Sequence, residues 1–75
     1  MLRSQEFIDM AAKFYVQILI PYHNANKDSV GVPLDTVQYL IEEVVQKRIT
    51  FSQAKMRYKD CCELMDFIRL ELKNV

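Results

Sequence analysis

Residues 51–75 carry an apolar side chain at every third or fourth position without a break, and this repeat constrains the fold more than any other feature. Charged residues fill most of the positions between. Such a spacing forms one apolar face only on an α-helix that packs lengthwise against other helices. We therefore predict a long helix over about residues 51–74. Its buried stripe is predicted to comprise Phe51, Ala54, Tyr58, Cys61, Met65, Ile68, Leu72 and Val75.

A first helix is predicted over about residues 4–22. Ser4 precedes a run of mainly apolar residues and is a favoured helix N-cap. Pro21 lacks a backbone N–H and disfavours helical geometry in the residue before it. The helix is therefore expected to end or kink at this proline.

A second helix is predicted between these two, over about residues 34–48. Pro33 is a residue type favoured in the first turn, and the apolar residues that follow share one helical face. The segment before it collects Asn, Asp, Ser, Gly and Pro, which is typical of a loop. The second and third helices are expected to form an antiparallel hairpin, with the first packed across it. The sequence thus predicts a single all-α, three-helix domain over residues 1–75, with helices at about 4–22, 34–48 and 51–74 and a loop at 23–33.

The apolar content is high for a chain of 75 residues, because hydrophobic residues make up 51% of it without counting glycine. A small domain has much surface relative to its interior, and below about 70–80 residues a lone core gives little stability. The surplus therefore indicates that some apolar surface is covered by a second copy of the chain or by a partner protein.

The first helix is the segment that best fits such an interface. Between residues 7 and 20 only Asp9, Lys13 and Gln17 are polar, and they follow one narrow stripe. The other two helices and the loop can cover the apolar remainder, or another chain can. We favour another chain, as a homodimer, because two-fold dimers are the commonest assemblies. The residues expected to bind the partner are Phe14, Tyr15, Ile18, Leu19 and Tyr22.

A local basic cluster offers an alternative function, a small DNA- or RNA-binding regulator. Its members surround the turn before the third helix, as in a helix-turn-helix motif. Against this, the turn lacks a small residue, Asp60 and Glu63 make the following turns acidic, and the net charge is zero. Nucleic-acid binding is therefore the less favoured function. The residues that would carry it are Lys47, Arg48, Lys55, Arg57 and Lys59.

Enzymatic or metal chemistry has little basis in this sequence. His23 is the one histidine, and Cys61 and Cys62 are adjacent rather than at zinc-ligand spacing. A single glycine excludes a glycine-rich phosphate loop. We expect reduced thiols, no catalytic residue, no metal or other cofactor, and no small-molecule substrate.

Location and partner class follow from the remaining patterns. The longest uncharged apolar run is far shorter than the roughly 20 residues of a membrane span, and acidic residues follow Arg3 too soon for a signal peptide. We expect a cytoplasmic protein without membrane contact. Its expected function is that of a non-enzymatic protein–protein interaction module, as an adaptor, a regulator or a chaperone-like protein.

Overall fold

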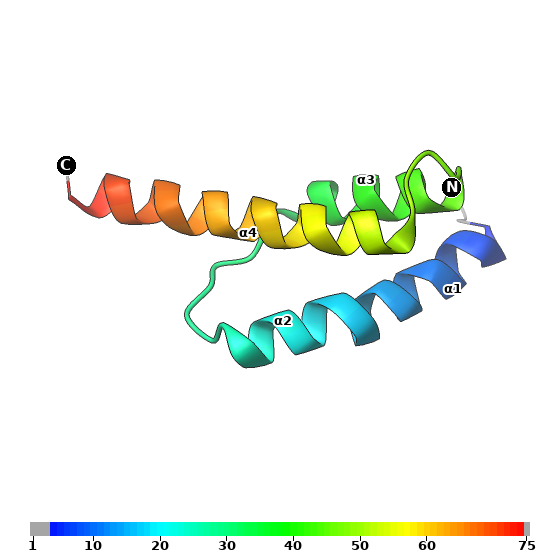
Figure 1. The fold of residues 1–75 in the computed structure, drawn as a ribbon, viewed down its shortest axis with the longest axis horizontal. Helices are drawn as coiled ribbons and strands as arrows, with labels where there is room; N and C mark the ends of the chain where they lie inside the picture. The colour runs from blue at the N-terminus through cyan, green and yellow to red at the C-terminus, as the bar shows by residue number, and fades with distance from the viewer. Residues whose placement is uncertain (1–3, 75) are drawn as a thin grey trace.

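The computed structural model describes residues 4–74 as three helical segments (Figure 1). The first, called here the N-terminal helix, joins α1 (Gln5–Phe14), a π-helical turn η1 (Tyr15–Leu19) and α2 (Ile20–Ala25) without a break. The others are α3 (Leu34–Val45) and α4 (Phe51–Lys73), which run antiparallel and form a hairpin. α3 contacts both other segments, and the described residues contain no strand. The all-α, three-helix prediction is confirmed.

The N-terminal helix continues past Pro21, where the sequence predicted that the helix ends or kinks. Its start is as predicted, because the Ser4 hydroxyl accepts a hydrogen bond from the Phe7 N–H at 3.2 Å. In η1 the Ile20 N–H donates to the Tyr15 carbonyl, five residues back instead of four. This wider turn accommodates the proline ring, whose missing N–H is then tolerated in the first turn of α2. The helix therefore ends at Ala25.

α3 is shorter than predicted and ends at Val45 instead of near residue 48. Lys47 adopts the left-handed conformation with φ 61°, which breaks the helix. The Arg48 N–H then donates to the Glu43 carbonyl at 2.9 Å, and the Lys47 N–H donates to the Val44 carbonyl at 3.0 Å. These bonds satisfy the last carbonyls of α3 and turn the chain into α4.

α4 begins at a capping box and is much the longest regular helix. The Thr50 hydroxyl accepts from the Gln53 N–H at 3.1 Å, and the Gln53 side-chain oxygen accepts from the Thr50 N–H at 2.8 Å. At 1.5 Å per residue, α4 is roughly 35 Å long and α3 roughly 18 Å. The C-terminal part of α4 therefore projects beyond the other helices (Figure 1).

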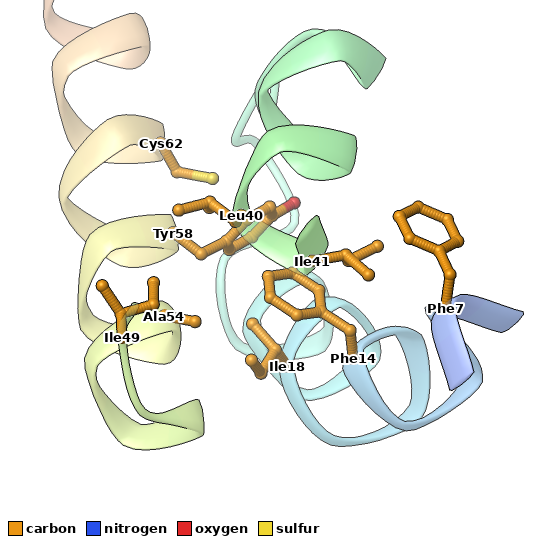
Figure 2. Close-up of a cluster of buried hydrophobic side chains, with 9 residues drawn as sticks. All are labelled: Phe7, Phe14, Ile18, Leu40, Ile41, Ile49, Ala54, Tyr58 and Cys62. Carbon is orange, nitrogen blue, oxygen red and sulfur yellow. The ribbon is translucent and has the colours of Figure 1, made fainter. Parts of the chain in front are cut away.

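The hydrophobic core lies where the N-terminal helix, α3 and the first half of α4 overlap (Figure 2). The Phe14 ring packs edge-on against Phe51 and Tyr58, with centroid distances of 6.3 and 6.0 Å. Ala54 provides a small side chain in the same cluster. The buried side chains are those of Phe7, Phe14, Ile18, Leu40, Ile41, Ile49, Ala54, Tyr58 and Cys62.

The predicted stripe of α4 is buried only in its first half. Ala54 and Tyr58 are buried as expected, but Cys62 is buried where the repeat predicted Cys61, which is half-buried. Ile68 and Leu72 are exposed. The C-terminal part of α4 projects beyond the other helices (Figure 1), which explains why its repeat is left uncovered. Phe51 and Met65 are half-buried, and Val75 lies outside the described residues.

Candidate protein-interaction surface

The five residues predicted to bind a partner do not form one exposed surface. Phe14 and Ile18 belong to the core, with 0% and 2% of their surface exposed, so the assignment of these two residues to an interface is corrected. They are buried because α3 and α4 cover that side of the N-terminal helix (Figure 2). Leu19 and Tyr22 are half-buried against the core, and Tyr15 is exposed.

The largest run of exposed apolar side chains lies instead on residues 64–73 of α4, which we call the overhang. Four large side chains there, those of Leu64, Phe67, Leu70 and Leu72, are each between 56% and 69% exposed. Ile68 is also exposed. Scattered apolar residues are ordinary on a protein surface. The overhang differs because five of its residues are large, exposed and apolar, and such a concentration is typical of an interaction site.

A shallow hollow lies along the overhang. It has a volume of about 470 Å³ and is lined on one side by Val30 of the connecting loop. Met65, Ile68 and Leu72 provide its apolar floor, with Arg69 and Lys73 as charged residues at its edge. The hollow can accept apolar side chains from another helix.

Two hydrogen bonds fix the loop against the overhang. The Val30 N–H donates to the Asp66 carboxylate at 2.8 Å, and the Arg69 guanidinium donates to the Asp28 carbonyl at 3.2 Å. The bond from Val30 holds the pKa of Asp66 below its ordinary value, because it stabilises the ionised carboxylate. The first turns of the overhang therefore have a defined position relative to the loop.

Charged residues on this part of α4 are ordered along the helix. Residues 60–66 contain three acidic side chains and no basic one, whereas residues 69–73 contain two basic side chains and one acidic. Residues 60–73 of α4 therefore change from acidic to mainly basic towards the end of the helix. The acidic residues are Asp60, Glu63, Asp66 and Glu71, and the basic residues are Arg69 and Lys73.

The five residues of the predicted nucleic-acid site are not brought together on one face. Arg48 forms an ion pair with Glu43, and Lys47 lies in the turn that ends α3. Lys55 and Lys59 are one turn apart on α4, whereas Arg57 lies two positions from each and so faces another direction. No continuous basic face of the kind that binds a phosphate backbone results.

A partly buried polar contact lies under the loop, and sequence reasoning missed it. The Nε2 atom of His23, in α2, is 2.8 Å from the Tyr58 hydroxyl. Burial raises the pKa of Tyr58, so the phenol keeps its proton. A β-carbon at Gly31 would lie 3.3 Å from the His23 ring, and Gly31 has a φ of 73°. No motif in the sequence signals this contact, which we assign to stability.

The two thiols are free and differ in their surroundings. Cys62 is buried, and burial raises the pKa of its thiol, whereas Cys61 is half-buried. Within residues 4–74, no group of three or more His, Cys, Asp or Glu side chains is placed to bind a metal ion. In the same range, no helix combines the length and apolarity that crossing a membrane requires.

No family model, curated protein or solved structure matches this chain. Functional inference therefore depends on the exposed apolar and charged groups of the described residues. The overhang could have been found from the sequence by comparing helix lengths, since the predicted third helix is much longer than the second. The repeat alone predicts a stripe that is buried along the full length of the helix.

Proposed function

We propose that this chain is a cytoplasmic, non-enzymatic protein–protein interaction module that forms a homodimer through the α4 overhang. The observation that carries the proposal is the group of apolar side chains exposed at the free end of α4. Covering a large apolar side chain contributes about 1.5–3 kcal/mol. Several such residues on one projecting helix therefore favour association, in an adaptor, a regulator or a chaperone-like protein.

Charge order supports a second copy of the chain as the partner. In an antiparallel crossing of the C-terminal halves of two α4 helices, the acidic residues 60–66 of one copy would lie beside the mainly basic residues 69–73 of the other. The arrangement is self-complementary, as a two-fold interface requires. The net charge of zero removes general repulsion between copies.

The size of the overhang predicts a weak dimer. A stable interface of standard size covers about 800 Å² on each partner, and smaller ones are typical of transient complexes. The overhang is a helical segment roughly 15 Å long. We therefore expect the dimer to dissociate at low concentration, with a dissociation constant in the micromolar range.

The test is sedimentation equilibrium of the full chain over a range from about 1 to 200 µM. The unchanged protein should shift from monomer to dimer, and the double variant Phe67→Glu, Leu72→Glu should stay monomeric. Both positions are exposed, so the fold should be retained, which circular dichroism checks. The matched control is Tyr15→Glu, an exposed apolar position on the N-terminal helix that should leave the dimer intact.

Two results would contradict the proposal. A chain that stays monomeric over the whole range rules out the homodimer. If the dimer persists in the double overhang variant but is lost in Tyr15→Glu, the interface lies on the N-terminal helix, near the surface that the sequence predicted.

A further inference from the structure

A second apolar groove lies between α2 and α4, at a different place from the overhang. It has a volume of about 330 Å³. α2 contributes Pro21, Tyr22 and Ala25 to its walls, and α4 contributes Met56. This volume is at the lower end of the range of small-molecule sites, about 300–1,000 Å³.

The floor of the groove is part of the packed core and is therefore preformed. Ile18 and Tyr58 line it, and each is 2% exposed. The Tyr58 ring is held in place by the contact of its hydroxyl with His23 and by edge-on packing against Tyr22, at 5.8 Å between centroids. Ala25 provides only a methyl group at the end of α2, which leaves the groove open there.

Two lysines give the groove its charge. Lys55 and Lys59 both line it and lie one turn apart on α4, so both ammonium groups can reach one anion. In the described part of the chain, neither lysine has an ion-pair partner within 4.0 Å. No acidic residue is among the residues that line the groove. The groove thus combines apolar walls with two unpaired positive charges.

From this combination we infer that the groove binds an amphipathic carboxylate, a small molecule with an apolar chain and one anionic headgroup, as in a medium-chain fatty acid. The apolar chain would lie against Met56 and Pro21, and the carboxylate would contact Lys55 and Lys59. A groove of about 330 Å³ suits a short chain better than a peptide helix. This inference does not depend on the proposed dimer.

The experiment titrates decanoate into the full chain, with decanol as the neutral analogue. Calorimetry measures affinity, and amide NMR shifts locate the site. Decanoate should bind saturably and shift the amides of residues 22–26 and 55–59. Decanol should bind about three- to tenfold more weakly, because it lacks two exposed ion pairs of modest strength.

Variants test both parts of the site. The double variant Lys55→Gln, Lys59→Gln should weaken decanoate binding about three- to tenfold without changing decanol binding. Ala25→Phe fills the groove and should remove binding of both, and Met56→Glu is a second, exposed substitution that should repel the carboxylate. Arg57→Gln is the matched control, since Arg57 is on the same helix but does not line the groove, and it should change nothing.

Several results would overturn the inference. They are the absence of saturable binding, equal affinity for decanoate and decanol, and amide shifts centred on the overhang. Loss of binding in Arg57→Gln equal to that in the double lysine variant would show a general charge effect. If an acidic apolar peptide binds at the groove and decanoate does not, the ligand of the groove is a protein partner and not a small molecule.

Discussion

The contact between the buried Tyr58 and the half-buried His23 allows a quantitative test of what holds the helices together. The substitution Tyr58→Phe removes one hydroxyl and keeps the ring, so the packing against Phe14 stays and no large cavity forms. What is lost is the 2.8 Å hydrogen bond to the His23 Nε2 atom. The effect on stability therefore reports on that bond.

The magnitude follows from the burial of the two partners. A buried hydrogen bond contributes about 1 kcal/mol net, and leaving its partner unsatisfied costs about 1–3 kcal/mol. Tyr58 is buried, but His23 is half-buried, so water can partly replace the lost bond. We expect Tyr58→Phe to lower the free energy of unfolding by about 1–2 kcal/mol. For a domain of this size, each kcal/mol corresponds to a fall in Tm of about 4–8 °C.

Urea unfolding followed by far-UV circular dichroism measures this difference. Tyr39→Phe is the matched control, because Tyr39 is exposed and its hydroxyl makes only a long, 3.4 Å bond to Glu43. This control should change stability by less than about 0.5 kcal/mol. If Tyr58→Phe costs no more than Tyr39→Phe, the contact with His23 does not stabilise the fold and the reasoning is refuted.

Three further predictions concern the thiols and the loop. Iodoacetamide should label Cys61 well before Cys62, because burial protects Cys62 and raises the pKa of its thiol; equal rates measured by mass spectrometry would contradict this. Asp66→Asn should speed hydrogen exchange at the Val30 amide, because it weakens the bond from that amide to the side chain. The fold lowers the pKa of the Asp66 carboxyl, so the unchanged protein should lose the protection of the Val30 amide as the pH falls through that lowered value. A protection factor that does not change with pH would argue against this role. Gly31→Ala should destabilise the fold by about 1 kcal/mol or more, because φ is positive there, and a neutral result in urea unfolding would count against this strain.

Local signals in the sequence were sufficient for most of the fold. Ser4 marks the start of the N-terminal helix, and the stripe of α4 is helical as its repeat predicts. The continuation of the helix through Pro21 could not be predicted, because it depends on the turn before the proline. A π-helical turn is not encoded by a recognisable residue pattern. The left-handed conformation of Lys47 is a similar case, since a lysine carries no signal for it.

The interaction surface was harder to predict because burial depends on neighbours. Phe14 and Ile18 are as apolar as the overhang residues, and only the position of α3 and α4 places them in the core. Leu72 continues the same repeat as Tyr58, yet one is exposed and the other is buried. A repeat specifies which face of a helix is apolar, whereas the lengths of its neighbours decide how much of that face is covered.

The overhang also affects how evenly stability is distributed along α4. A helical segment of ten residues does not persist alone in water, so the overhang is helical because it extends a helix that starts at the capping box of Thr50 and is held by the core. The end of α4 projects beyond the other helices (Figure 1), so its hydrogen bonds can open without unfolding the core. The hydrogen-bonded amides of residues 70–73 would therefore exchange faster than those in the middle of α4. Their protection by a bound second copy would link the length of the ordered helix to protein concentration.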